Sequence, residues 1–149
     1  MNIAIIPARI GSKRLPKKNI KSFLGKPMIY YAILAAKKSK LFEKIVVSTD
    51  SKKIKKISEF YGAEVPYLRS KALSNDKIHF NHSVKDMIKW LKNKKIYPKN
   101  ICCIYPTSPL LDKKFLIKGY KLFCKTRNFV FSACLFRSPP QRGFYLIKK

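Results

Sequence analysis

A chain of 149 residues with 46% hydrophobic residues is long enough for one domain with a core, and too apolar for an intrinsically disordered protein. Its formal net charge of +27 comes from 34 Lys and Arg against 7 Asp and Glu, which suits an anionic partner such as nucleic acid, a membrane surface or a small molecule. The lysines are spread along the whole chain, so we rank a solvated cationic surface above nucleic-acid binding, and an anionic small molecule fits the charge equally well.

The chain opens with an apolar run, residues 3–8, that predicts a buried strand of a parallel sheet. A loop follows at residues 9–19 and carries Gly11 and five cations. It is neither a Walker A loop nor a dinucleotide fingerprint, because the glycine spacing of both motifs is absent. Charge and glycine alone leave two interpretations open, a phosphate-binding loop and a basic surface loop.

Helices and strands then alternate along the chain. Pro27 stands near the start of the first predicted helix, and Ser51 caps the second, which has Ile54, Ile57 and Phe60 inward and ends at Gly62. Two more helices are predicted at residues 81–94 and 112–125, the last with Phe115 packed inward. The remaining predicted strands are residues 45–48, 64–67, 101–105 and 129–136.

This alternation predicts an α/β domain over residues 1–149 with right-handed crossovers and a mostly parallel sheet. Ligands of such sheets bind beyond the carboxyl ends of the strands. We therefore expect one crevice to be ringed by the five segments that follow strands, which are residues 9–19, 49–50, 69–80, 106–109 and 139–142.

Neither a membrane span nor a signal peptide is predicted, because no apolar run approaches ~20 residues, so we expect a cytoplasmic protein without a membrane partner. The four cysteines, Cys102, Cys103, Cys124 and Cys134, lack metal-type spacing. Reduced cysteines in the core are the expectation, and a metal site is the weaker alternative.

Residues 5–19, I-I-P-A-R-I-G-S-K-R-L-P-K-K-N, resemble the opening of the acylneuraminate cytidylyltransferases, the CMP-sialic-acid synthetase family. The resemblance continues, in family order, through G-K-P at 25–27, V-V-S-T-D at 46–50, G-A-E-V-P at 62–66 and P-T-S-P-L at 106–110. The branch that acts on pseudaminic acid is the most similar, on residues 84–91, 102–105 and 140–142.

The resemblance implies a Rossmann-like three-layer nucleotidyltransferase fold and transfer of CMP from CTP to a nine-carbon acid sugar. The product would be a CMP-sugar, with pyrophosphate released, for surface glycans or flagellin glycosylation. Pseudaminic acid is the expected sugar, and N-acetylneuraminic acid is an alternative. A CTP-binding chain with impaired catalysis is a second alternative, and a basic nucleic-acid-binding module is a third.

The same resemblance assigns the site residues. Arg9 and Lys18 would contact the phosphates as catalytic cations, and the other expected nucleotide contacts are Ala8, Gly11, Ser12, Lys13, Arg14, Asn19 and Arg69. The expected sugar contacts are Thr107, Ser108, Gln141 and Arg142. Surface charge is the plainer alternative for Arg14 and Arg69, and Asp50 is expected to cap the following helix more than to hold nucleotide.

The sequence departs from the family at Ile10, where family members usually have a small or polar residue, and a β-branched side chain there disfavours a positive φ. Family members are also longer. Their magnesium ligands and dimer-forming segment correspond to sequence beyond Lys149, so the resemblance implies Mg²⁺ and a homodimer for full-length proteins, and we expect the C-terminal part of the fold to be missing.

Overall fold

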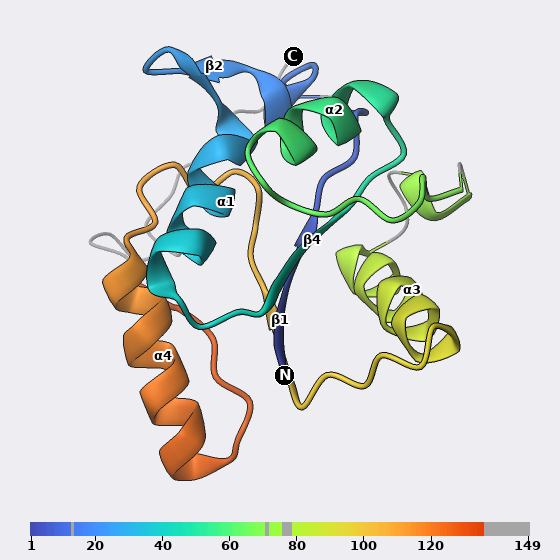
Figure 1. Cartoon of the computed structure of the whole chain (residues 1–149). Coiled ribbons are helices and arrows are strands. Elements are labelled where there is room, and N and C mark those ends of the chain that lie inside the picture. Colours follow the sequence, from blue (N-terminus) through green and yellow to red (C-terminus); the bar gives the residue numbers. More distant parts are fainter. Residues whose placement is uncertain (13, 71, 76–78, 136–149) are drawn as a thin grey trace, which may run out of the picture. The chain divides into compact units, whose positions relative to one another are not determined.

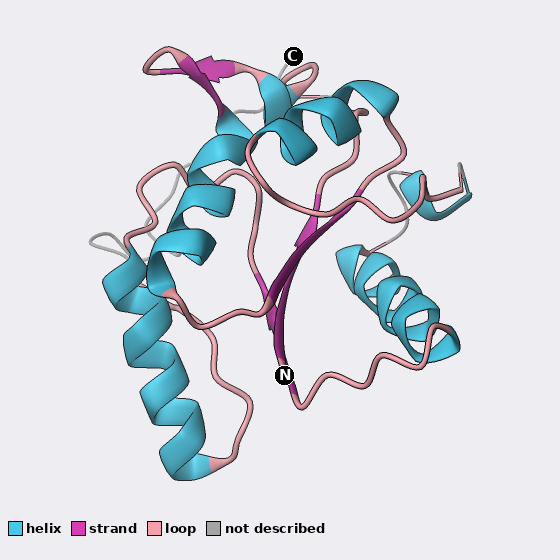
Figure 2. Ribbon diagram, viewed as in Figure 1, coloured by secondary structure: helices cyan, strands magenta, loops and turns pink. Residues whose placement is uncertain are grey.

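The computed structural model describes residues 1–12, 14–70, 72–75 and 79–135, and its chain forms two compact units, Met1–Ile117 and Lys118–Lys149. The first unit has the predicted α/β architecture (Figures 1 and 2). Its main sheet has the strand order β4-β1-β5 and is parallel throughout. These strands are β1 (Asn2–Pro7), β4 (Lys44–Ser48) and β5 (Asn100–Cys103).

Strand β1 is the centre of this sheet and is buried on both faces, as its continuous apolar run predicts. Successive side chains of a strand point to opposite faces, so Ile3 and Ile5 pack into a different cluster from Ala4 and Ile6. Helix α3 (Phe80–Asn93) covers the Ile3 face with Met87 and Leu91.

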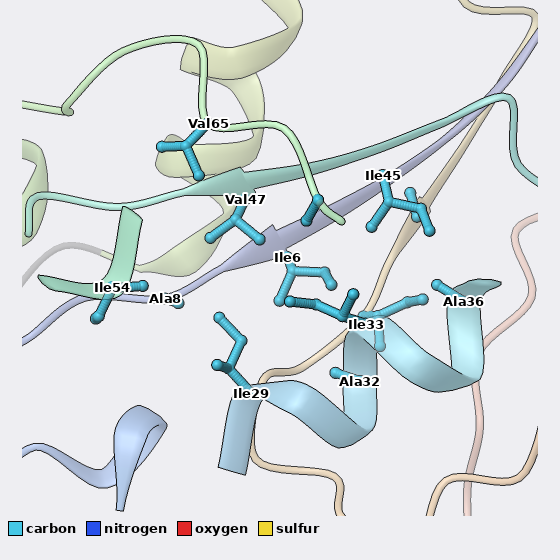
Figure 3. Close-up of a cluster of buried hydrophobic side chains, with 13 residues drawn as sticks. Ile6, Ala8, Ile29, Ala32, Ile33, Ala36, Ile45, Val47, Ile54 and Val65 are labelled. Atoms are coloured by element: carbon cyan, nitrogen blue, oxygen red, sulfur yellow. The ribbon is translucent and has the colours of Figure 1, made fainter. Parts of the chain in front are cut away.

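Helices α1 (Met28–Ser39) and α2 (Lys52–Phe60) lie on the other face of the sheet. There they enclose the larger core cluster, in which Ile29 and Ile33 of α1 and Ile54 of α2 meet Ile6 and Val47 (Figure 3). The arrangement is therefore helix, sheet, helix, and the three-layer fold expected from the sequence is confirmed.

The helix boundaries follow local chemistry. The Ser51 hydroxyl accepts a hydrogen bond from the Ile54 amide at 3.4 Å, which confirms the predicted cap of α2. Gly62 follows this helix with φ +86°, a conformation that glycine adopts without strain. Asp112 precedes α4 (Lys113–Thr126), and its carboxylate accepts from the Lys114 amide at 2.8 Å.

Smaller elements complete the described residues. The loop after β1 ends in the 3-10 helix η1 (Lys18–Ile20), and a second 3-10 helix, η2 (Ala72–Ser74), precedes α3. Between η1 and α1, strands β2 (Ser22–Phe23) and β3 (Lys26–Pro27) form a short antiparallel hairpin.

Several expectations about strands are wrong. Ile101 and Cys103 of β5 are exposed, so the two cysteines do not belong to a buried strand. Residues 64–67 make only an isolated bridge, Val46 to Glu64, because Pro66 cannot donate to a ladder. Within the described part of the predicted last strand, residues 129–135 form no strand.

Other side chains also differ from the sequence predictions. Phe60 of α2 is 82% exposed and Phe115 of α4 is 57% exposed, although both were expected to point inward. Cys102 is half-buried and the other three cysteines are exposed, and all four are free thiols.

No helix within the described residues is both long and apolar enough to cross a bilayer.

Candidate functional site

A cleft of about 440 Å³ opens where the first unit's strands end. Four separate segments line it: the loop after β1, the segment between α2 and α3, the start of α3 and the turn after β5. Its lining residues are Pro7, Arg9, Gly11, Ser12, Lys18, Asn19, Arg69, Leu73, Asn75, His79, Phe80, Ser83, Tyr105, Pro106 and Thr107. Three of the five segments expected to ring one crevice therefore meet here. Residues 49–50 do not line the cleft but contact its first loop through Asp50 and Ile10. Residues 139–142 lie outside the described part of the chain.

Two side chains hold the loop after β1 by hydrogen bonds to its backbone. The Asp50 carboxylate accepts a hydrogen bond from the Ile10 amide at 2.9 Å, and the Asn19 side-chain amide donates to the Arg9 carbonyl at 2.8 Å. Asn19 is buried, and the Ala8 amide donates to the Ser48 carbonyl at 2.8 Å, which continues the sheet into the loop. The loop is thus braced over its first residues, and Gly11 faces open space, with nothing within 4 Å of where a Cβ would stand.

Three cations line the cleft: Arg9, Lys18 and Arg69. No carboxylate is among the described lining residues, so the cleft is an electropositive concavity. Arg69 is only 5% exposed, and burial lowers the pKa of its guanidinium, which Arg9 lowers further while Asp50 raises it. Two guanidinium groups that repel each other and line the same cleft are suited to a multiply charged anion.

Ser74 links these two arginines. Its hydroxyl accepts from Arg69 Nε at 3.2 Å, and its carbonyl lies 3.5 Å from Arg9 Nη1. Arg69 is also tied by its backbone, since its amide donates to the Thr49 carbonyl at 2.8 Å. Arg69 is therefore a fixed, buried cation, and the surface-charge alternative is wrong for it.

Aromatic side chains also line the cleft. Phe80 packs edge-on against Tyr105 with ring centroids 5.0 Å apart, and His79 lies beside Phe80 at 4.4 Å. His79 Nδ1 also accepts from the Asn81 amide at 3.4 Å and so caps α3. The cleft thus combines a cationic side with a flat apolar side, a combination that suits an aromatic ring bearing phosphates.

Most residues expected at the site from the sequence line the cleft. They are Arg9, Gly11, Ser12, Lys18, Asn19, Arg69 and Thr107. Ala8, Arg14 and Ser108 are not among its lining residues, and Ala8 is buried in the core while Arg14 is exposed. Lys13, Gln141 and Arg142 lie outside the described residues.

Sequence reasoning missed three features of the cleft. Asp50 was expected to cap the helix after it, but Ser51 makes that cap and Asp50 braces the loop at Ile10. Ser74 gave no signal, because its contact with Arg9 joins segments 65 residues apart. The aromatic pair could have been anticipated, since Phe80 directly precedes a predicted helix and Tyr105 is the last residue of a predicted strand.

The β-branched residue Ile10 does not stand in a left-handed backbone conformation. Ile10 is not among the residues with positive φ, so its β-branched side chain meets no backbone conflict there. In this loop the left-handed conformation falls instead on Lys17, at φ 54°, directly before η1.

A divalent metal does not fit the described residues. No group of three or more His, Cys, Asp and Glu side chains among them could hold one. Asp50, the carboxylate behind the loop, already accepts the Ile10 amide. Hard divalent cations need several oxygen ligands, so we assign no ligand for Mg²⁺ to these residues.

Comparison with known proteins gives a consistent result. The sequence pattern of the family described as "Cytidylyltransferase" matches residues 3–123. A pseudaminic acid cytidylyltransferase of Campylobacter jejuni is 43% identical over 97% of this chain, which spans 63% of that relative's length. A CMP-N,N'-diacetyllegionaminic acid synthase of Legionella pneumophila is 45% identical over 72% of this chain and 46% of its own length.

A solved structure agrees at the level of the fold. A CMP:2-keto-3-deoxy-manno-octonic acid synthetase complexed with CTP superposes with a TM-score of 0.70 and 19% identity. The match covers 85% of this chain and 48% of that one.

Proposed function

Because the chain belongs to the cytidylyltransferase family, we propose that its cleft binds CTP and that it serves the transfer of CMP from CTP to a nonulosonic acid sugar. One observation carries this proposal: Arg9, Lys18 and Arg69 come from separate segments of the chain and line one cleft where the strands end. A triphosphate is the part of CTP that needs such a cationic surface.

The sugar is proposed from the relatives. Alignment to a pseudaminic acid cytidylyltransferase covers 97% of this chain, which makes pseudaminic acid the first choice of acceptor. The product would serve surface glycans or flagellin glycosylation, and the cytoplasm, where CTP is made, is the compartment we propose. Thr107, at the cleft beside Tyr105, is the described residue that we assign to the sugar.

The proposed reaction is a single in-line displacement. The anomeric hydroxyl of the sugar attacks the α-phosphorus of CTP, the bond from this phosphorus to the bridging oxygen breaks, and pyrophosphate leaves with that electron pair. The hydroxyl proton passes to solvent or to pyrophosphate. Arg9, Lys18 and Arg69 would bind the triphosphate and neutralise the charge that builds on the leaving group, because phosphoryl transfer depends mostly on positioning and electrostatics.

The family resemblance also implies Mg²⁺, which would add further charge neutralisation when bound. The described residues offer no cluster to hold it, so no step above depends on it. The same observation supports a second candidate function, CTP binding without turnover by this stretch of chain.

The decisive experiment measures binding and turnover together. Titration calorimetry with CTP, UTP and cytidine tests the cleft, and pyrophosphate release with CTP, Mg²⁺ and pseudaminic acid tests the reaction. N-acetylneuraminic acid in place of pseudaminic acid tests the choice of sugar.

We expect CTP to bind more tightly than cytidine, because cytidine lacks the phosphates that the three cations would contact. Pyrophosphate release with pseudaminic acid but not with N-acetylneuraminic acid supports the full proposal. Binding without release supports the second candidate, and failure to bind CTP contradicts both.

A further inference from the structure

We propose that Asp86 and Tyr67 form a positioning pair for Arg69, which holds the segment carrying this cation against α3 so that the guanidinium faces the cleft. The inference rests on the proposed function, because it concerns a cation of the same cleft. Neither residue lines the cleft, so the pair acts through Arg69.

Helix α3 grips Tyr67 at two points. The Tyr67 hydroxyl donates a hydrogen bond of 2.5 Å to Asp86 Oδ2, and the Tyr67 ring packs on Trp90 with centroids 5.6 Å apart. Asp86 and Trp90 are four residues apart on α3, so they share one face of the helix. Both ends of the Tyr67 side chain are therefore held by the same element.

The segment that carries Arg69 needs such an anchor. It belongs to no strand, and among the described residues backbone contacts join it to β4 and Thr49 at only two places: the isolated bridge at Glu64, and the bridge at Leu68 with the hydrogen bond from the Arg69 amide to the Thr49 carbonyl. Tyr67 stands two residues before Arg69 and packs against the Ile3 core cluster. The pair thus adds a side-chain attachment to α3 close to Arg69, beside the backbone contact of Arg69 with Thr49.

The pair also acts on the charge of Arg69. Burial lowers the pKa of this guanidinium, whereas the carboxylates of Asp50 and Asp86 raise it and so favour the charged form. The first effect is the larger, as expected for a cation that is 5% exposed. Asp86 therefore offsets part of the cost of keeping a buried cation beside Arg9.

Other described carboxylates have different tasks. Glu59 and Glu64 pair with lysines at the surface, at 3.0 Å from Lys55 and 2.8 Å from Lys44. Asp112 caps α4. In a chain with only 7 acidic residues, placing two carboxylates, Asp50 and Asp86, where they favour the charged form of one arginine indicates a function at that arginine.

The test compares Tyr67→Phe and Asp86→Asn with Tyr31→Phe. Tyr31 is the matched control, since its hydroxyl donates a hydrogen bond of 2.6 Å to the Phe23 carbonyl away from the cleft. We expect Tyr67→Phe to weaken CTP binding about three- to tenfold, the value of one hydrogen bond, and Tyr31→Phe to leave it within about twofold. A melting temperature that falls equally in both variants, with CTP affinity unchanged, overturns the proposal.

A double-mutant cycle tests whether the pair acts through Arg69. In an Arg69→Ala background, Tyr67→Phe should weaken CTP binding no further, because the group that it positions is gone. Equal losses in the two backgrounds overturn the proposal. Asp86→Asn keeps an acceptor for the Tyr67 hydroxyl and removes only the charge. Its loss of CTP affinity should be smaller than that of Tyr67→Phe if attachment dominates, and larger if charge dominates. Unchanged CTP affinity in both variants contradicts the pair.

A readout independent of CTP separates this inference from the proposed function. The Arg69 Nε–H resonance in a ¹⁵N NMR spectrum should shift in Tyr67→Phe and stay in place in Tyr31→Phe. If the parent chain fails to bind CTP while this shift occurs, the proposed function fails and the positioning pair stands. An unshifted Arg69 resonance overturns the pair whether or not CTP binds.

Discussion

Arg9 is the residue at which the proposed function is most exposed to test. It lines the cleft, follows the central strand directly, and has its carbonyl held by Asn19. Arg9→Ala should weaken CTP binding by roughly ten- to a hundredfold, because a hydrogen bond to a charged group contributes ~1.5–3 kcal/mol. Titration calorimetry of the variant and the parent chain measures the ratio.

Lys38→Ala is the matched control for this prediction. Lys38 is an exposed cation in the last turn of α1, so its loss lowers the net charge by the same amount without touching the cleft. We expect less than a twofold change in CTP affinity. Equal losses from both variants would show that general charge, and not the cleft, attracts the nucleotide.

The sequence also located much of the candidate site at the residue scale, and its failures share one cause. Gly11 and Lys18 were assigned from the contiguous motif at residues 5–19 and Arg69 from a separate family match, and all three line the cleft. Asp50 and Ser74 were misjudged or missed because their partners lie 40 and 65 residues away, at Ile10 and Arg9. Such contacts depend on how the segments after different strands meet, which no local pattern contains.

At the scale of elements, the β2–β3 hairpin holds an apolar residue in a strained turn. Leu24 and Gly25 connect the two strands with φ of 45° and 75°, the conformation of a type I′ turn, which favours Asn-Gly. Leu24 is also 82% exposed, so replacing it removes little packing. Leu24→Asn should raise the free energy of unfolding by about 0.5–1 kcal/mol, measured by urea denaturation.

Leu110→Asn serves as the control for the hairpin. Leu110 is 84% exposed and is not among the residues with positive φ, so the same exchange there changes no backbone preference of this kind. A stabilisation of similar size at Leu110 would attribute the effect to the loss of an exposed apolar side chain instead of turn conformation.

The end of α2 gives a prediction of opposite sign. Gly62 has φ +86°, and a Cβ at this position would lie 2.6 Å from the Lys37 ammonium, which donates to the Tyr61 carbonyl at 3.3 Å. Gly62→Ala should therefore lower the free energy of unfolding by about 1–2 kcal/mol, through the left-handed backbone and the displaced lysine. Gly119→Ala in α4, where nothing lies within 4 Å of the added methyl, should not destabilise, and urea denaturation of both variants checks the contrast.

Helices were predicted more accurately than strands, for a physical reason. The caps and periodicity that define α2 and α3 are local, so Ser51 and Gly62 marked the boundaries of α2 correctly. Whether a strand is buried on both faces depends on the elements that pack against it. Strands β4 and β5 both contain apolar runs and both lie at an edge of the sheet, yet β4 is mostly buried and β5 is partly exposed, a difference that follows only from the assembled fold.

At the scale of the whole molecule, the net charge of +27 bears on stability and binding together. Lysines spread over the chain repel one another in the compact state, and salt screens this repulsion. The attraction of an anion to the cationic cleft is screened by the same salt. One change of solvent should therefore move the two properties in opposite directions.

Raising NaCl from about 50 to 500 mM should increase the melting temperature while weakening CTP binding several-fold, because the Debye length falls from more than ~10 Å to less than ~5 Å. Cytidine is the internal control: without phosphates, its weaker binding should change little with salt.

The basic nucleic-acid-binding alternative predicts a different pattern, in which a DNA duplex binds with a steep linear fall of log affinity against log salt and CTP fails to displace it. Calorimetric titrations of CTP, cytidine and duplex at three salt concentrations distinguish a local anion site from a general polycation, since only the first discriminates CTP from cytidine and yields to Arg9→Ala.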